Sequence, residues 1–179
     1  MQLTNPLPAT ARAKKLRLMI FDVDGILTDG SLHYGPDGEL MKTFNVLDGL
    51  GIKLLQQSGV ATAIISARQS PVVARRAADL GVKIVRQGVH DKQAAFEATL
   101  AETALSAVEC GFMGDDIIDL PVMTRVGFAA SVPNGHAEVR ERAHYVAQAG
   151  GGRGAVREVC DFILRAQGNY EAALALYLR

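Results

Sequence analysis

The chain lacks several features that would place it in a particular class of protein. It has no Trp, only two Cys among 179 residues and no net charge, because 19 Lys and Arg balance 19 Asp and Glu. This balance argues against a nucleic-acid or membrane-surface binder and leaves room only for a local basic pocket. No apolar segment is long enough to cross a bilayer, and the run Leu18 to Phe21 is too short for a signal peptide.

The cysteines and the length indicate the compartment and the domain count. Cys110 and Cys160 are single and widely spaced, so they form neither a disulfide framework nor a CxxC metal or redox pair. The sequence therefore predicts a cytoplasmic protein with two inert thiols. Its length suits one globular domain, which we expect over residues 16–179 after an N-terminal tail at 1–15.

Short apolar runs alternate with helical segments along the chain. Buried strands are predicted at residues 16–21, 60–65, 82–85, 108–113, 126–130 and 144–147. Helices are predicted from Asp48 to Gly59, from Ser70 to Gly81, at 91–105, 116–125 and 136–142, and after Gly154. A β-hairpin is predicted at about 30–44, around the turn residues 35–38. This alternation is typical of a Rossmann-like α/β fold, with a mostly parallel sheet and helices on both faces.

Residues that suit phosphoryl transfer follow four of these strands. They are Asp22 and Asp24 after the first strand, Ser66 after the second, Lys92 after the third, and Asp115, Asp116 and Asp119 after the fourth. Solvation explains any one of these polar residues, but it explains the set poorly. Because ligands of such folds bind at the carboxyl ends of parallel strands, we expect these side chains to converge at one edge of the sheet.

Each of these residue types has a role in the transfer of a phosphoryl group. Asp22 and Asp115 can share Mg²⁺, which takes one or two protein carboxylates and completes its octahedron with water and phosphate. Asp22 can attack phosphorus to form an aspartyl-phosphate, while Asp24 acts as acid for the leaving alkoxide and then as base for water. Ser66 and Lys92 can hold the phosphoryl oxygens.

The same residues resemble the four motifs of the haloacid dehalogenase superfamily of phosphatases. The matching segments, in order, are Asp22-Val-Asp-Gly25, the strand-terminal Ser66, Lys92 and Gly114-Asp115-Asp116-x-x-Asp119. The resemblance implies Asp22 as the nucleophile and as a metal ligand, together with the backbone carbonyl of Asp24 and the carboxylate of Asp115. Asp116 and Asp119 would be supporting acids next to the nucleophile and the metal ligands. The segments between the motifs are too short for a cap domain, so the expected fold is capless.

From about residue 16 to 164 the chain resembles one capless family, the 3-deoxy-D-manno-octulosonate 8-phosphate (KDO 8-phosphate) phosphatases. The matching segments are Asp22-Val-Asp-Gly-Ile-Leu-Thr-Asp-Gly30, Phe44-Asn-Val-Leu-Asp-Gly49 and Gly151-Gly-Arg-Gly-Ala-Val-Arg-Glu-Val-Cys-Asp161. The resemblance implies a Mg²⁺-dependent phosphatase of lipopolysaccharide precursor biosynthesis. It also implies a homotetramer with the hairpins at its centre and with shared active sites.

The family pattern extends to the substrate and to the C-terminal segment. By resemblance, the substrate contacts are Asn45, Val46, Leu47, Asp48, Gly49, Lys53, Arg68, Arg76 and Lys92. The segment from about 150 to 179 would be a tail that closes the site of the next subunit, through Gly151, Gly152, Arg153 and Gly154. Deletion of the residues after Ala149 is then expected to impair turnover and to leave the fold intact.

Several positions depart from the family pattern and leave alternatives open. Ser66-Ala67 stands where the family more often has Thr-Gly, and Leu47 and Lys53 stand where Arg is usual. Arg binds a carboxylate bidentately, so its absence leaves a related substrate open, such as a nonulosonate 9-phosphate. An alternative from another class is a non-catalytic oligomeric module of the same fold. The joint retention of the acids and Lys92 argues against that module.

Overall fold

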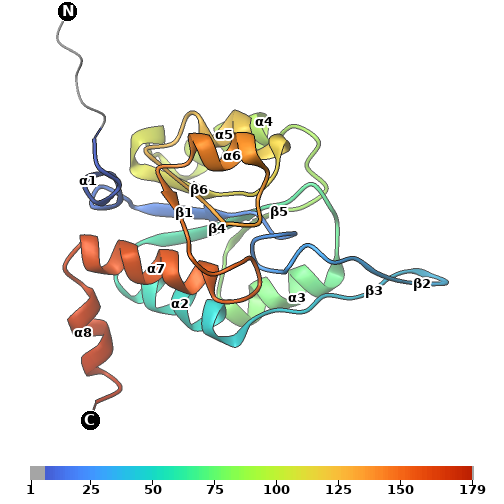
Figure 1. Cartoon of the computed structure of the whole chain (residues 1–179), viewed down its shortest axis with the longest axis horizontal. Helices are drawn as coiled ribbons and strands as arrows, with labels where there is room; N and C mark the ends of the chain where they lie inside the picture. The colour runs from blue at the N-terminus through green and yellow to red at the C-terminus, as the bar shows by residue number, and fades with distance from the viewer. Residues whose placement is uncertain (1–6, 179) are drawn as a thin grey trace, which may run out of the picture.

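The computed structural model describes residues 7–178, and its centre is a parallel sheet of six strands (Figure 1). In spatial order the strands are β5 (Ile84–Arg86), β4 (Ala61–Ile65), β1 (Leu18–Phe21), β6 (Cys110–Met113), β7 (Phe128–Ser131) and β8 (Tyr145–Val146). Every neighbouring pair is parallel. The predicted α/β fold is confirmed, and each strand begins and ends within two residues of its predicted bounds.

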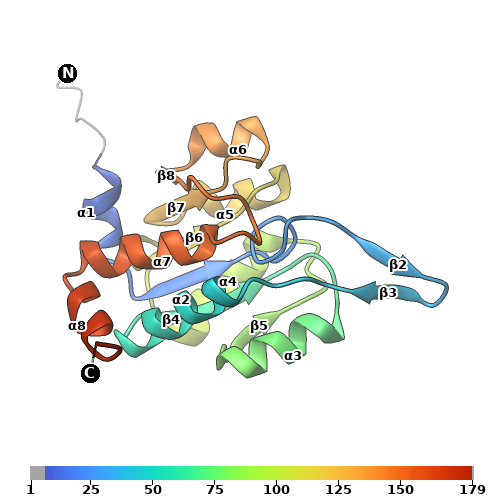
Figure 2. The same cartoon turned by 60° about the horizontal axis from the view of Figure 1, so that its bottom comes forward.

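Helices cover both faces of the sheet (Figures 1 and 2). One layer contains α2 (Val46–Gln57), α3 (Pro71–Leu80) and α7 (Ala155–Ala166), and the other contains α4 (Lys92–Thr103), α5 (Leu120–Met123) and α6 (Ala137–Arg142). Short 3-10 turns at Ala107–Glu109 and Ile117–Asp119 precede β6 and α5. The segment between the first and third motifs, residues 22–92, holds only the hairpin, α2, β4, α3 and β5, so it contains no cap domain.

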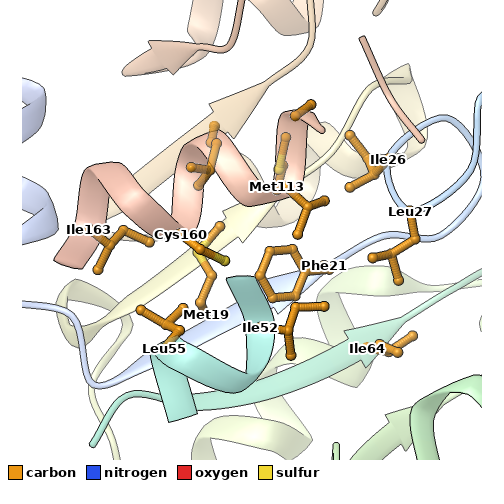
Figure 3. Close-up of a cluster of buried hydrophobic side chains, with 14 of the residues drawn as sticks. Met19, Phe21, Ile26, Leu27, Ile52, Leu55, Ile64, Met113, Cys160 and Ile163 are labelled. Carbon is orange, nitrogen blue, oxygen red and sulfur yellow. The ribbon is translucent and has the colours of Figure 1, made fainter. Parts of the chain in front are cut away.

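The central strand β1 packs against both helical layers. Met19 and Phe21 belong to the cluster under α2 and α7, which Figure 3 shows around Ile52. Leu18 and Ile20 belong to the opposite cluster, under α4, α5 and α6. All four strand residues have no exposed surface, as expected for the centre of a parallel sheet with both faces covered.

Local signals place the ends of several elements. Ser70 caps α3 by accepting a hydrogen bond from the N–H of Val73, Pro71 is its first residue, and Gly81 ends it with φ of 72°. The hairpin consists of β2 (His33–Gly35) and β3 (Gly38–Met41) and projects away from the sheet (Figure 2). The structure confirms these predicted features. They could be predicted because each depends only on residues close together in the chain.

Both ends of the chain are more structured than predicted. Within the predicted N-terminal tail, α1 (Ala9–Ala13) packs on the domain, and the Arg12 guanidinium donates to the carbonyl of Gly127 at 2.9 Å. Residues 1–6 of that tail lie outside the described residues. At the other end, α7 is followed by α8 (Tyr170–Ala175).

The segment after Ala149 contributes to the hydrophobic core. Helix α7 packs along α2, and its residues Val156, Val159 and Ile163 have no exposed surface. A deletion after Ala149 would expose the core residues of the sheet and of α2 that α7 covers. The expectation that such a deletion leaves the fold intact is therefore wrong.

The cap of α2 also differs from the prediction. Asn45 caps this helix by accepting from the N–H of Leu47 at 2.8 Å. Asp48 lies inside the first turn and is 2 % exposed, and its carboxylate accepts from the N–H of Arg157 at 2.8 Å and of Gly154 at 3.4 Å. Asp48 therefore caps α7, and it does so across a separation of 109 residues.

Two remaining predictions concern the thiols and the membrane. Cys110 and Cys160 are both buried, and burial raises the pKa of Cys110 to about 11 and also raises the pKa of Cys160. Because the thiolate is the reactive form, the prediction of inert thiols is confirmed. Among residues 7–178, no helix has the length and apolar character needed to span a bilayer.

The cap formed by Asp48 gives a prediction for stability. We expect Asp48→Ala to lower the free energy of unfolding by about 1 kcal/mol, the usual effect of removing a helix cap. Urea unfolding followed by circular dichroism measures this change. Asp79→Ala is the matched control, because Asp79 is an exposed member of an ion pair on α3 and its loss should cost about 0.5 kcal/mol or less. An equal loss in the two variants would contradict the capping role.

Candidate active site

The predicted catalytic residues meet at the carboxyl ends of β1, β4 and β6. Asp22, Asp24 and Ser66 line a cavity of about 420 Å³, and Lys92 is buried next to Asp22. The residues that line this cavity are Asp22, Asp24, Gly30, Leu32, Ser66, Ala67, Arg68, Asp115, Asp116 and Ile118. The predicted convergence of the strand ends is therefore confirmed. The geometry follows from the parallel order of the sheet, which brings the end of every strand to the same edge.

Asp22 is the first residue after the central strand and is held by a buried lysine. The Lys92 Nζ lies 2.8 Å from the Oδ1 of Asp22 and 2.5 Å from the Oδ1 of Asp119. Lys92 begins α4, where Asp91 caps the helix by accepting from the N–H of Ala94. Burial alone would lower the pKa of Lys92, but the two carboxylates outweigh it and raise that pKa. Lys92 therefore stays charged and neutralises part of the acidic cluster.

Asp119 supports the loop that carries the fourth motif. Its second oxygen, Oδ2, accepts from the N–H of Asp115 at 3.0 Å and of Asp116 at 3.2 Å. A Cβ at Gly114 would lie 2.6 Å from the Asp119 side chain, so the loop closes this tightly only with glycine. Both oxygens of Asp119 thus have partners within the chain. This geometry is consistent with the supporting role expected for Asp119.

Asp115 carries the oxygen that most needs a further partner. Its Oδ1 is buried and has no hydrogen-bond partner among the residues that the structure describes. Burial, together with the charges of Asp22 and Asp119, raises the pKa of Asp115 to about 7. Oxygens of these three acids lie within 4.8 Å of one another. A buried carboxylate oxygen without a donor beside other carboxylates suits a hard divalent cation, so the predicted magnesium site fits these residues.

The loop after β1 approaches Asp115 very closely. Gly25 has φ of 89°, and a Cβ there would lie 2.0 Å from the Oδ2 of Asp115. Both the positive φ and the contact require glycine at this position. The glycine of the first motif therefore lets the backbone that carries Asp22 and Asp24 lie directly against the acid of the fourth.

Asp24 has a cationic partner that no motif in the sequence indicates. Its Oδ1 forms an ion pair with the Nζ of Lys42, and its Oδ2 lies 3.8 Å from the Nε of Arg68. Burial lowers the pKa of Lys42, but the contacts to Asp24 and Glu39 outweigh it and raise that pKa. In the sequence, Lys42 resembles any solvated lysine after a strand. Only the path of the hairpin back to the sheet brings it to Asp24.

Part of the predicted substrate set lies outside this cavity. Of that set, Arg68 lines the cavity and is half-exposed, whereas Lys92 is buried and contacts Asp22. The residues that do not line it are Asn45, Val46, Leu47, Asp48, Gly49, Lys53 and Arg76. Arg76 donates to the carbonyl of Asn45 at 3.3 Å and lies over the ring of Phe44, at the base of the hairpin. Their contact with substrate stays a prediction.

The glycine-rich segment packs on the loop after β1 of its own chain. The N–H of Gly152 donates to the carbonyl of Ile26 at 2.9 Å, and a Cβ at Gly151 would lie 1.7 Å from the carbonyl oxygen of Gly25. The Arg153 guanidinium lies 3.5 Å from Asp29. The segment therefore braces the loop that carries the first motif, and its predicted role at a neighbouring subunit stays a prediction.

The raised pKa of Asp115 predicts how a cation affects stability. The folded, metal-free protein holds the proton of Asp115 more tightly than the unfolded chain, whose pKa is the ordinary 3.8. The stability that this proton supplies is present below about pH 4 and is lost as the pH rises through about 7. We expect Mg²⁺ to raise the melting temperature more at about pH 8 than at about pH 5.5, because the cation must displace this proton.

Thermal melting with and without Mg²⁺ at the two pH values measures this effect. Asp115→Asn is the control, because it keeps the side-chain shape and removes the charge. It should lose most of the shift that Mg²⁺ produces. A wild-type shift that persists undiminished in Asp115→Asn would contradict the proposed ligand.

Comparisons with known proteins agree with this geometry. No family model matches the chain. The 3-deoxy-D-manno-octulosonate 8-phosphate phosphatase of Escherichia coli (strain K12) is 44% identical over 163 residues, which cover 91% of this chain and 87% of that protein. The crystal structure of the Yersinia pestis phosphatase of the same name matches with a TM-score of 0.89 at 44% identity, covering 91% of this chain and 88% of that one.

A further solved structure contains ligands. The Moraxella catarrhalis 3-deoxy-D-manno-octulosonate 8-phosphate phosphatase, in complex with magnesium ion, phosphate ion and KDO, matches with a TM-score of 0.92 at 42% identity. The match covers 94% of this chain and 97% of that chain. Identity at this level over nearly the whole of both chains shows that this chain belongs to the 3-deoxy-D-manno-octulosonate 8-phosphate phosphatase family, within the haloacid dehalogenase superfamily.

Proposed function

We propose that the protein hydrolyses 3-deoxy-D-manno-octulosonate 8-phosphate to KDO and phosphate through an aspartyl-phosphate on Asp22. The observation that carries the proposal is the position of Asp22 in the cavity, with Lys92 on one carboxylate oxygen and Asp115 beside it. The relatives named above favour the eight-carbon sugar acid over a nonulosonate 9-phosphate. The phosphatase names of these relatives also favour an enzyme over a non-catalytic module.

The nucleophile is oriented by its buried contacts. Lys92 holds the Oδ1 of Asp22, so the Oδ2 can attack phosphorus and the alkoxide leaves from the opposite side. Burial and the neighbouring Asp119 raise the pKa of Asp22, while Lys92 opposes this shift. Mg²⁺ held by the carboxylates of Asp22 and Asp115 and the backbone carbonyl of Asp24 would supply the charge that offsets repulsion between the nucleophile and the phosphate.

Asp24 handles the proton at both steps. It lies at the cavity two residues after the nucleophile, and there it gives a proton to the leaving alkoxide. It then takes a proton from the water that cleaves the aspartyl-phosphate, which returns the site to its starting state. Ser66, directly after β4, lines the cavity and supplies a donor for the phosphoryl oxygens, and Lys92 beside Asp22 supplies a second. Arg68, which also lines the cavity, supplies a cation for the rest of the substrate.

The proposal includes a homotetramer in which subunits share their sites. The hairpin and the start of α2 expose apolar side chains that a partner would cover, namely Tyr34, Leu40, Met41, Val46 and Leu47. In such an assembly, the predicted substrate residues at the hairpin base and the glycine-rich segment would face a neighbouring site. We also place the enzyme in the cytoplasm, in lipopolysaccharide precursor biosynthesis, and its two buried free thiols fit a reducing compartment.

The nucleophile can be tested with a panel of substrates. We expect the wild-type protein with Mg²⁺ to release phosphate from 3-deoxy-D-manno-octulosonate 8-phosphate faster than from a nonulosonate 9-phosphate. Asp22→Asn should release none, because the amide is a poor nucleophile, and its melting temperature reports whether the fold is retained. Asp79→Asn is the control at an exposed position and should keep wild-type activity. Wild-type turnover in Asp22→Asn would exclude the aspartyl-phosphate.

The shared assembly can be tested at the hairpin. Leu40 is 67% exposed, and we expect Leu40→Glu to lower the mass in solution and to reduce kcat/KM, because a buried charge at the interface is costly. Val108→Glu is the matched control, since Val108 is 61% exposed but lies outside the hairpin. Analytical ultracentrifugation measures the mass. A wild-type protein that is an active monomer would contradict the proposed assembly.

A further inference from the structure

Lys42 is buried at the point where the hairpin returns to the domain. It follows β3 directly, and its side chain is only 2% exposed. Its ammonium contacts the Oδ1 of Asp24 and lies 3.1 Å from the Oε2 of Glu39. Burying an ammonium is costly unless charged partners compensate, so both carboxylates are needed to keep Lys42 in this place.

A second set of contacts holds Glu39, the other carboxylate partner of Lys42. The Oε1 of Glu39 accepts a hydrogen bond from the Oγ of Ser70. Ser70 is 1% exposed and caps α3, and its backbone N–H donates to the Oε1 of Gln87 at 2.9 Å. The network therefore joins β3, α3 and the loop after β5. It leaves Lys42 little freedom to move away from Asp24.

The two oxygens of Asp24 have different surroundings. Oδ1 is held by the buried Lys42, whereas Oδ2 has the Nε of Arg68 at 3.8 Å. The Arg68 side chain is 48% exposed and lines the cavity, so it remains accessible to a ligand. Lys42 is too buried to touch substrate. One oxygen of Asp24 is thus fixed by a buried cation, while Oδ2 has a more distant and exposed cation beside it, and the Asp24 side chain lines the cavity.

We propose that Lys42 is a positioning residue for Asp24, held in turn by Glu39 and Ser70. This inference rests on the proposed role of Asp24 as acid and base. By holding Oδ1, Lys42 keeps Oδ2 in line with the alkoxide that receives the proton and with the water that later gives one up. The hairpin thereby contributes to catalysis within its own chain, in addition to any part in assembly.

The first test compares two lysine variants. General acid–base catalysis contributes about 10²- to 10⁴-fold, so misplacing Asp24 in Lys42→Met should lower kcat by about 10- to 100-fold. KM should change by less than about 3-fold, because Lys42 does not reach the substrate. Lys83→Met is the matched control, since Lys83 is exposed and directly precedes β5, at the amino end of that strand. Unchanged kcat in Lys42→Met, or a change in KM alone, would overturn the proposal.

A double-mutant cycle separates positioning from a general loss of structure. In an Asp24→Asn background the acid and base is already absent, so Lys42→Met should cause no further loss of kcat. An equal fold-loss in both backgrounds would show a merely structural role. Glu39→Gln removes one charge that holds Lys42 and should give a smaller loss of kcat with the same dependence on Asp24. If Lys42→Met does not fold, Glu39→Gln is measured in its place. A wild-type kcat in Glu39→Gln would then overturn the proposal.

The cycle also distinguishes this inference from the proposed function. If the wild-type protein with Mg²⁺ releases no phosphate from 3-deoxy-D-manno-octulosonate 8-phosphate, the proposed function fails. If the wild-type protein is active and the loss in Lys42→Met does not depend on Asp24, only the role of Lys42 fails.

Discussion

Three carboxylates crowded at the end of the central strand are the constraint on which the rest of the structure depends. Oxygens of Asp22, Asp115 and Asp119 lie within 4.8 Å of one another, and Asp22 and Asp119 are almost fully buried. Like charges at such distances repel strongly where little water is present. Lys92 compensates part of this charge, and of the three acids it forms ion pairs with Asp22 and Asp119. The charge of Asp115 is left to be compensated by a proton or a cation. The proposed chemistry depends on a cation in that place.

Glycines let the surrounding loops come close enough to form this cluster. Gly25 places the loop after β1 against Asp115, and Gly114 lets the next loop close over Asp119. Gly151 then packs on the carbonyl of Gly25 from a distant part of the chain. A side chain at Gly25 or Gly114 would clash with an acid of the cluster, and one at Gly151 would clash with the backbone of the loop that carries Asp22 and Asp24. The glycine-rich segment therefore has a role within its own chain, and this role does not depend on assembly.

The hairpin has two roles to fill in a protein whose described residues include no cap domain. With no cap domain in residues 22–92, the hairpin is the main insertion between the first two motifs. Both of its strands expose apolar side chains, and at its base Lys42 contacts Asp24. The same element thus exposes apolar side chains on one side and contacts the proposed acid and base on the other.

Local patterns in the sequence determined the elements and the strand ends. The caps at Ser70 and Gly81, the turn of the hairpin and the apolar strand runs depend on residues a few positions apart, so backbone hydrogen bonding and periodicity suffice to predict them. The parallel order then brings Asp22, Ser66 and Asp115 to one edge, whatever the details of the loops.

The tertiary structure alone decided which distant side chains meet. Asp48 was predicted to start its own helix, but it caps α7 across 109 residues, and Lys42 reaches Asp24 only because the hairpin returns to the domain. Asp48 and Lys42 look like ordinary polar residues in the sequence. Their partners depend on the path of whole loops and on how helices pack, and no short pattern in the chain encodes such contacts.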